Sequence, residues 1–195
     1  MLDKLKKRRT QYALGKTLPL SEDKVDALIR EAIRQSPSSF NSQSSRAVIL
    51  FGKESDKFWS ITREALRAIV PAADFEATSK KIDSFAAGAG TVLFFEDQEP
   101  IKALQEKFAL YADNFPIWSH HSAGMAQLAV WTALADVGIG ASLQHYTPLV
   151  DAEVAKTWNL PASWKLIAQM PFGSNEAGFP EKSFIDDAVR FRTHR

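Results

Sequence analysis

The sequence contains no cysteine among its 195 residues. This absence excludes disulfides, thiolate metal ligands and cysteine nucleophiles, and it is compatible with a reducing compartment. Histidine is also scarce, with four residues. His120 and His121 are adjacent in a predicted helix, where neighbouring side chains point about 100° apart and do not share one ion easily. A metal hydrolase that uses them with His145 is thus a disfavoured alternative, and we expect no metal site.

The sequence also lacks an excess of either charge. It has 24 Lys and Arg residues against 23 Asp and Glu residues, a formal net charge of +1. This balance gives no reason to expect nucleic acid or a membrane surface as a partner. No run reaches the roughly 20 apolar residues of a membrane span, and the first segment, MLDKLKKRR, lacks the apolar stretch of a signal peptide. We therefore expect a cytoplasmic protein, with residues 1–195 forming one domain.

The most apolar stretch, Ser119–Val137, predicts a single helix. A helix without a charged face is normally buried on all sides, and Gly138 is expected to end it. Residues Ile139–Leu143 then predict a short strand, which leads into the polar and aromatic segment Gln144-His145-Tyr146. Such a strand can aim the segment at a ligand. The alternative is a plain core helix followed by a surface turn.

Hydrophobic periodicity and turn residues predict the remaining elements. A helix is expected between Ser21 and Pro37. Further helices are expected over Met1–Lys7 (with Leu2 and Leu5 facing inward), Ser55–Val70, Phe75–Phe85, Pro100–Phe108 and Pro148–Trp158, and strands over Ala47–Phe51, Thr91–Phe95 and Trp164–Met170. Tyr111–Trp118 is expected as a connection, Pro171–Pro180 as a loop, and Ile185–Phe191 as an edge strand or extended arm.

Two polar motifs are candidate ligand sites. The first is Arg8-Arg9-Thr10, because two guanidinium groups and a hydroxyl can hold a phosphate; a solvated basic end is the alternative. The second is the stretch Pro37–Arg46, rich in small hydrogen-bonding side chains around Phe40. It lies between a helix and a strand, where ligand loops are common; a simple connector is the alternative.

These motifs, in this order, resemble the nitroreductase family of flavin enzymes. The resemblance is carried by Arg8-Arg9-Thr10, Pro37–Gln43, Gly90–Asp97, the stretch from Trp131 to Tyr146, and Lys182 in a Lys-Ser-Phe context. The similarity covers essentially the whole chain and is greatest to the small subgroup of fatty-acid-repression-mutant-like (Frm2-like) nitroreductases.

The resemblance implies an α+β fold with a mostly antiparallel central sheet flanked by helices, assembled as an intertwined homodimer. It implies one flavin mononucleotide (FMN) at each of two interface sites. The implied phosphate ligands are Arg8, Arg9, Thr10 and Lys182. Ser38, Ser39, Asn41 and Gln43 would reach the flavin from the partner chain, and Gln144, His145 and Tyr146 would lie beside the isoalloxazine ring with their backbone near N5.

The implied activity is electron transfer from NADH or NADPH to nitroaromatic or quinone acceptors by a ping-pong mechanism, with the chemistry at flavin N5 and no catalytic side chain. The candidates for lining the acceptor slot are Phe40, Phe75, Phe115 and Trp118, each of which could instead be a core residue. The alternative function is a flavin-binding regulatory or redox-sensing protein with little turnover, linked to lipid signalling or stress.

The chain departs from the family pattern at Tyr12. Larger members of the family carry a lysine at this place, which faces N1 and O2 of the flavin. Because reduced flavin is stabilised by a positive group near N1, another cation is expected there, with Arg9 and Arg63 as the candidates.

Overall fold

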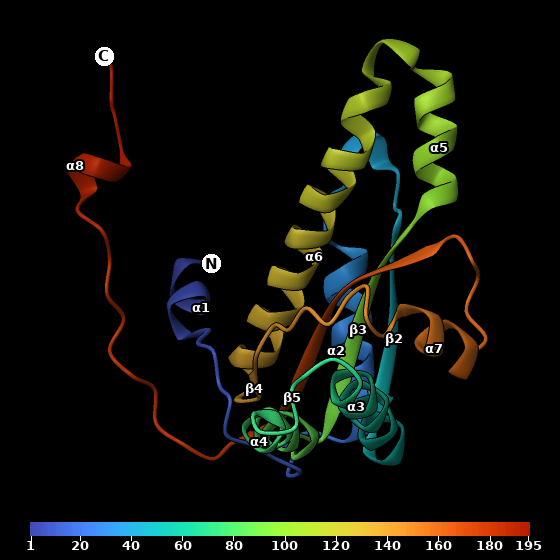
Figure 1. Ribbon diagram of the computed structural model, residues 1–195. Coiled ribbons are helices and arrows are strands. Elements are labelled where there is room, and N and C mark those ends of the chain that lie inside the picture. The colour runs from blue at the N-terminus through green and yellow to red at the C-terminus, as the bar shows by residue number, and fades with distance from the viewer.

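The computed structural model describes residues 1–195, and an antiparallel sheet lies at its centre (Figure 1). The strands are β1 (Leu14–Gly15), β2 (Ser45–Phe51), β3 (Gly90–Asp97), β4 (Gly140–Ala141) and β5 (Trp164–Asn175). Their order is β1-β5-β3-β2, with β4 also paired to β5, and every pairing is antiparallel. The predicted α+β class with a mostly antiparallel sheet is confirmed.

The central strand β3 is buried along its whole length. Since successive side chains of a strand point to opposite faces, Val92 and Phe94 belong to one apolar cluster, while Leu93 and Phe95 belong to the other. A strand covered on both faces needs apolar residues at every position. This burial explains the unbroken apolar run that predicted the strand.

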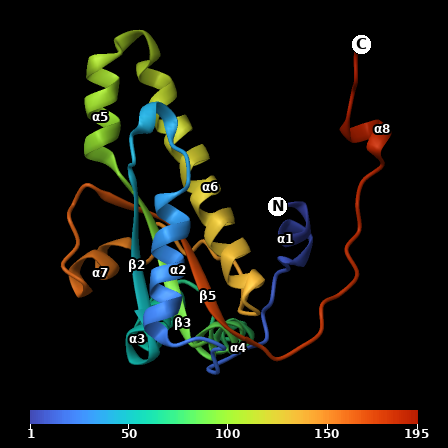
Figure 2. The same ribbon diagram turned by 180° about the vertical axis from the view of Figure 1, so that it is seen from behind.

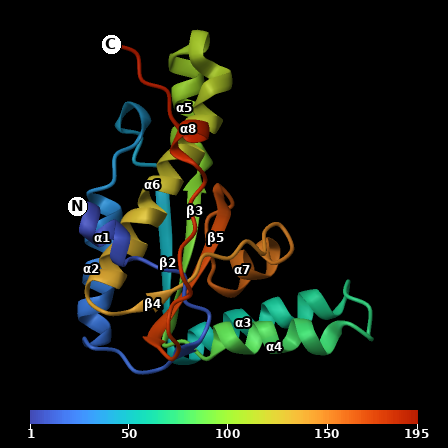
Figure 3. The same ribbon diagram turned by 90° about the vertical axis from the view of Figure 1, so that its left-hand side faces the viewer.

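Helices cover both faces of the sheet. They are α1 (Leu2–Lys7), α2 (Glu22–Arg34), α3 (Gly52–Arg67), α4 (Phe75–Ala86), α5 (Gln98–Lys107), α6 (Phe115–Asp136), α7 (Asp151–Thr157) and α8 (Asp187–Arg190). One face packs against α2 and α6, as seen from behind in Figure 2, and the other packs against α3, α4 and α7. Figure 3 shows the α3–α4 pair projecting from its side of the sheet. None of the helices combines the length and apolar content needed to cross a membrane.

The predicted apolar helix is confirmed as α6, which begins at Phe115. The last residues of the expected Tyr111–Trp118 connection are therefore helical, with Pro116 in the first turn, where its missing N–H costs nothing. Gly138 follows the helix with a φ of 85°, a conformation that glycine adopts without steric cost. One side of α6 leaves large apolar side chains in contact with solvent, namely Ile117, Met125 and Leu128.

Several predicted bounds and burials are wrong. Leu2 is 67% exposed, because α1 lies on the outside of α6 and buries only part of Leu5. The expected strand after Gly138 shrinks to the two residues of β4, and the helix expected from Pro148 begins at Asp151. The segment expected as an edge strand or extended arm contains the short helix α8, which starts where the Asp186 side chain accepts a hydrogen bond from the Ala188 amide.

Strand β5 continues through Pro171 to Asn175, a region expected to be a loop. Proline usually interrupts a central strand because it has no N–H to donate. In a strand, however, the N–H and C=O of one residue point to the same side, and the Pro171 carbonyl accepts from the Ser142 amide at 3.3 Å. The missing N–H therefore falls on the side of Ser142, where β4 has ended, and the ladder to β3 is intact.

Beyond β5 the chain leaves the sheet and runs past α1, away from the other elements (Figures 1 and 2). We call residues 180–195 the C-terminal arm. Its large apolar side chains are exposed, namely Phe184, Ile185, Val189 and Phe191.

Candidate functional site

The Arg8-Arg9-Thr10 motif lies between α1 and the sheet. Thr10 forms a parallel bridge with Ala141 of β4, and the Gln11 amide donates to the Ala141 carbonyl at 2.9 Å. The buried Gln11 side chain also donates to the Ala177 carbonyl at 2.7 Å. These bonds fix the backbone of the motif against β4, near the C-terminal end of α6.

The two arginines form a cationic pair without a carboxylate. The Arg8 guanidinium lies 4.4 Å from the ring centroid of Trp131 in α6, and Arg9 donates to the Pro180 carbonyl. Neither guanidinium has a carboxylate oxygen within 4.0 Å. Burial lowers the pKa of Arg8, and the charge of Arg9 lowers that pKa further. A dianionic phosphate placed here would relieve this repulsion and match the planar guanidinium groups.

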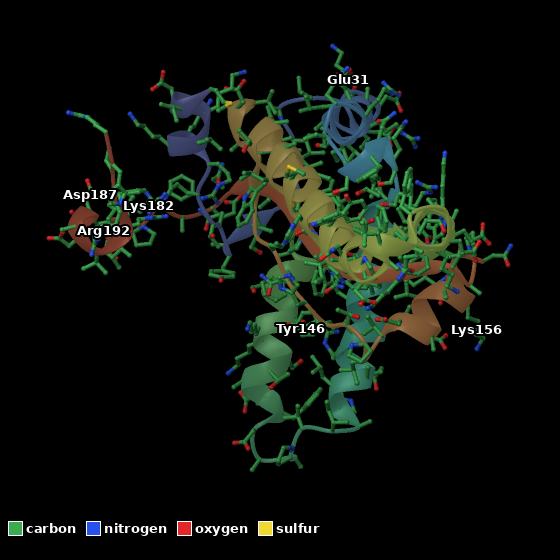
Figure 4. The ribbon with its side chains drawn as sticks, turned by 90° about the horizontal axis from the view of Figure 1, so that it is seen from above. Glu31, Tyr146, Lys156, Lys182, Asp187 and Arg192 are labelled. Atoms are coloured by element: carbon green, nitrogen blue, oxygen red, sulfur yellow. The ribbon has the colours of Figure 1, made fainter.

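Lys182 belongs to the C-terminal arm and not to the body of the protomer. Figure 4 shows it beside α8, remote from Tyr146. It has no carboxylate partner, and its ammonium lies 5.2 Å from the Phe184 ring. Within one protomer, the link between this lysine and the arginine pair is the bond from Arg9 to Pro180 at the start of the arm.

The loop of residues 38–43 has an unusual backbone. Phe40, Asn41 and Gln43 have φ values of 54°, 51° and 46°, in the left-handed region that costs non-glycine residues energy and that persists mainly at functional sites. The Ser38 hydroxyl accepts from the Gln43 amide at 2.9 Å, and the Ser39 amide donates to Ser122 of α6 at 3.3 Å. The loop is therefore held in one shape against α6.

One protomer does not bring this loop to the arginine pair. The loop contacts α6 at Ser122, whereas Arg8 contacts α6 at Trp131. Along a helix that rises about 1.5 Å per residue, these two contacts are about 14 Å apart. The predicted phosphate ligands and the predicted loop ligands thus lie at different levels of the same helix.

The segment Gln144-His145-Tyr146 is fixed by Gln169, a residue of β5 that is 0% exposed. The Gln144 amide donates to the Gln169 carbonyl at 2.7 Å, and the Gln169 amide donates back at 2.9 Å. The Gln169 side-chain oxygen accepts from the Tyr146 amide at 2.7 Å. His145 is exposed, and its own amide has no partner within the chain.

The side chains of this segment diverge. Tyr146 is half-buried, its ring centroid lies 5.9 Å from that of Trp59 in an edge-to-face arrangement, and burial raises the pKa of its hydroxyl. The buried Gln144 side chain donates to Ser142 at 3.0 Å. Of the three predicted side chains, His145 is the one that faces solvent.

The four aromatic residues predicted to line the acceptor slot lie in two separate regions. Phe40 lies 5.3 Å from Phe115 and 6.1 Å from Trp118, between ring centroids, and its ring is nearly parallel to that of Trp118. Phe40 is 52% exposed, whereas Phe115 is buried. Phe75 lies apart from them at the start of α4, with the Arg67 guanidinium 4.2 Å from its ring.

The two candidate cations for flavin N1 differ in their surroundings. Arg63 of α3 forms an ion pair with Asp83 of α4, so its charge is already balanced. Arg9 has no such partner. Tyr12, which stands in place of the family lysine, is exposed and lies 6.2 Å from Phe85, between ring centroids.

A buried carboxylate lies at the base of the 38–43 loop. Glu96, the seventh residue of β3, is 1% exposed and accepts hydrogen bonds from the hydroxyls of Ser44 and Ser45. Burial raises the pKa of Glu96 above its ordinary value, and the two hydroxyls oppose that shift. Next to it, Asp97 pairs with Arg46 at 2.9 Å.

Comparison with known proteins assigns the chain to a protein family. Residues 5–174 match the model of the nitroreductase family. Two yeast proteins from Saccharomyces cerevisiae are similar over 190 residues, 96% of this chain and 94% of theirs: HBN1 at 35% identity and the nitroreductase FRM2 at 33% identity. The chain therefore belongs to the nitroreductase family.

Solved structures agree with this assignment. The nitroreductase CinD from Lactococcus lactis, in complex with chloramphenicol, has a TM-score of 0.92 and 51% identity, covering 100% of this chain and 99% of CinD. Other structures of CinD contain nicotinic acid or 4-nitrophenol. A nitroreductase with bound FMN from Desulfitobacterium hafniense has a TM-score of 0.71 at 16% identity, covering 100% of both chains, and shows the shared fold.

Proposed function

We propose that this protein is an FMN-dependent oxidoreductase that takes electrons from NADH or NADPH and passes them to nitroaromatic or quinone acceptors. Membership of the nitroreductase family supports oxidoreductase chemistry. The observation that carries the cofactor assignment is the Arg8–Arg9 pair, which is fixed against β4 and has no carboxylate to balance it. Such a pair fits the phosphate of FMN.

The residues around the arginine pair would hold the ribityl phosphate. Arg8 and Arg9 supply two forked sets of donors, Thr10 supplies a hydroxyl, and Lys182 supplies a further cation from the arm. When bound, FMN supplies the redox chemistry, accepting a hydride equivalent at N5 and giving electrons to an acceptor. The role of the chain is to bind and orient the reactants. Because one site serves donor and acceptor in turn, we expect ping-pong kinetics.

The segment 144–146 would orient the flavin ring. Its free donor is the His145 amide, since the amides of Gln144 and Tyr146 already donate to Gln169. A fixed N–H aimed at a position where negative charge develops is an effective form of electrostatic stabilisation. The imidazole of His145 has no hydrogen bond in the structure, so the proposal assigns it no proton transfer.

The acceptor class follows from the relatives and from the aromatic side chains. CinD was crystallised with chloramphenicol, 4-nitrophenol and nicotinic acid. In this chain, Phe40, Phe115 and Trp118 offer aromatic surface next to the 38–43 loop, and flat rings pack well on such surface. We propose that they line the acceptor slot, with Phe75 as a further candidate.

A homodimer is part of the proposal. The exposed side of α6 carries Ile117, Met125 and Leu128, and the C-terminal arm carries four more large apolar side chains. Obligate interfaces are apolar in this way and resemble a core cut in half. A second copy would also place its 38–43 loop, with Ser38, Ser39, Asn41 and Gln43, near the arginine pair of the first. The proposed setting is cytoplasmic, with the chain as one domain.

The first experiment is a visible spectrum of the purified protein with and without added FMN. The expected result is a flavin spectrum in a folded dimer, followed by bleaching on addition of NADH or NADPH. Recovery of colour with 4-nitrophenol or a quinone would establish the acceptor side, and parallel double-reciprocal lines would establish ping-pong order. A protein that binds no FMN would overturn the proposal. Binding with slow bleaching and no turnover would favour the regulatory alternative.

A substitution locates the phosphate. A charge-assisted hydrogen bond contributes about 1.5–3 kcal/mol, so Arg9→Ala should weaken FMN binding by roughly tenfold or more. The control is Lys6→Ala, because Lys6 is exposed and pairs loosely with Asp3 at 4.0 Å. Equal affinity in wild type and Arg9→Ala would show that the phosphate lies elsewhere.

A further inference from the structure

Gln169 is a buried amide in β5, between the buried apolar residues Ala168 and Met170. It lies opposite Leu93 of β3 and is 0% exposed. Its side-chain nitrogen has no hydrogen-bond partner. A buried polar group with an unsatisfied donor is costly, and an apolar residue of similar size would avoid that cost. The hydrogen bond that this side chain does make is accepted by its oxygen.

The orientation of the amide is set by its neighbour. The group that faces it at 2.7 Å is the Tyr146 N–H, which is a donor and requires an acceptor. The amide oxygen must then point to Tyr146, and the nitrogen is left without a partner. The unsatisfied nitrogen is thus the consequence of supplying an acceptor to Tyr146.

Gln169 holds the chain on both sides of His145. Its backbone exchanges two hydrogen bonds with Gln144, and its side chain accepts from Tyr146. The amides before and after His145 are both engaged, whereas the His145 amide is free and its side chain is exposed. A single residue therefore determines which N–H of this segment is available to a ligand.

We infer that Gln169 is a positioning residue that orients the His145 amide toward the flavin ring and thereby tunes the redox potential of the bound flavin. This inference rests on the proposed FMN site. Gln169 itself does not touch the reacting atoms, since it is fully buried behind the segment that it holds. It affects the flavin by setting the direction in which the His145 backbone N–H points.

The first test needs no flavin. In Gln169→Met, which keeps the length of the side chain and loses the acceptor, the Tyr146 amide should exchange with solvent about tenfold faster than in wild type. The control is Thr62→Val. Thr62 of α3 is also fully buried, and its hydroxyl donates to the Phe58 carbonyl of the same helix at 3.0 Å, so its bond does not involve the segment. Unchanged exchange at Tyr146 in Gln169→Met would overturn the inference.

The second test uses the FMN-loaded protein. Added FMN should slow exchange at the His145 amide and leave the amides of Gln144 and Tyr146 as they were. In Gln169→Met, the ratio of affinities for reduced and oxidised flavin should fall about tenfold, which lowers the two-electron potential by about 30 mV. Thr62→Val should leave the potential unchanged. A potential that moves equally in both variants would reveal a purely structural role and contradict the inference.

A third variant distinguishes loss of the acceptor from misfolding of the protein. Gln169→Glu keeps an oxygen at the same place, and burial disfavours its ionised form, so the Tyr146 amide should stay protected near pH 6. Loss of protection in both Gln169→Glu and Gln169→Met would overturn the assigned acceptor role. If wild type binds no FMN, the proposed function fails on that measurement, whereas the exchange data still decide whether Gln169 fixes the segment.

Discussion

The guanidinium of Arg8 lies 4.4 Å from the centroid of the Trp131 ring, so a residue that precedes the first strand packs against a residue about three-quarters of the way along α6. The contact orients a cation that has no carboxylate partner. It also connects the proposed phosphate site to the helix that carries the exposed apolar side chains. Binding of the cofactor and packing of α6 are therefore expected to depend on each other.

Removing the Trp131 ring should weaken FMN binding. A cation–π contact contributes about 0.5–2 kcal/mol, so Trp131→Leu is expected to lower FMN affinity by about two- to thirtyfold. Trp131→Phe should retain most of the affinity, because it keeps a ring and removes an indole N–H that is buried without a partner. The measurement is a titration of FMN followed by quenching of its fluorescence.

The control for this prediction is Trp158→Leu. Trp158 also has a cation near its ring, the Lys57 ammonium at 5.9 Å, and it belongs to the other face of the sheet. Its loss should leave FMN affinity close to that of wild type. Equal weakening by Trp131→Leu and Trp158→Leu would mean that the effect comes from general destabilisation.

A charge on the exposed side of α6 should separate the proposed dimer. Leu128 is 44% exposed in the protomer, and a carboxylate buried without a partner in an apolar interface costs several kcal/mol. Leu128→Asp should therefore give monomers that bind FMN poorly, because the partner loop is lost. Light scattering and an FMN titration on the same sample measure both effects.

Ile69→Asp is the matched control for the dimer. Ile69 is 64% exposed and lies just after α3, on the opposite face of the sheet from α6. This variant should remain a dimer with bound FMN. Wild-type protein that stays monomeric at micromolar concentration would contradict the proposed assembly directly.

Much of the fold could be predicted from the sequence, because the decisive signals are local. The run of apolar residues in β3 is unbroken since both faces of the strand are covered. Helix α6 has no charged face, and its apolar residues lie both on the side packed against the sheet and on the exposed side. The end of β5 was not predictable in this way. Whether Pro171 interrupts a strand depends on which neighbour lies beside its missing N–H, and that neighbour, Ser142, is distant in the sequence.

The same contrast between local and long-range signals applies to the candidate site. Residue types and their order predict the Arg8-Arg9-Thr10 motif and the 38–43 loop as ligand sites. Gln169 is not among the predicted site residues, although an amide between the apolar residues Ala168 and Met170 is a detectable signal. Its partners, Gln144 and Tyr146, come from a separate stretch of the chain. The left-handed backbone of Phe40 was also missed, because nothing in an aromatic residue predicts a positive φ.

The buried carboxyl of Glu96 predicts a specific pH dependence of stability. Its pKa in the folded chain is raised above the ordinary value of 4.5 by burial, so the folded state holds this proton over a range in which the unfolded state has released it. The contribution to stability is complete below the unfolded pKa and is lost as the pH rises through the folded pKa. Glu96→Gln cannot ionise and does not show this loss.

Urea unfolding of wild type and Glu96→Gln at several pH values tests this prediction. The difference in free energy of unfolding should change in favour of Glu96→Gln as the pH rises from the ordinary glutamate pKa of 4.5 through the raised pKa of the folded state. The substitution also alters the bonds to Ser44 and Ser45, but this effect does not depend on pH. It therefore shifts the difference in free energy by a constant and leaves its dependence on pH unchanged. Glu99→Gln, at an exposed position in the first turn of α5, is the control for the same type of substitution nearby. A flat line for Glu96→Gln would show that Glu96 ionises normally.

We expect the backbone amide of His145 to act on the flavin and its imidazole to have no chemical role. The side chain is exposed and makes no hydrogen bond within the chain, whereas the amide is the free donor of the segment. If the imidazole acted as a general acid, His145→Gln would slow flavin reduction by roughly 10²–10⁴-fold. Hydride transfer to N5 requires no proton from this residue, and glutamine keeps the backbone N–H. We therefore expect less than about a tenfold loss, with FMN still bound, in stopped-flow reduction by saturating NADH or NADPH. Gln169→Met, which leaves the imidazole in place and disturbs the amide, should change the flavin potential more than His145→Gln does. A hundredfold loss in a dimeric, FMN-saturated His145→Gln protein would establish a chemical role for the imidazole.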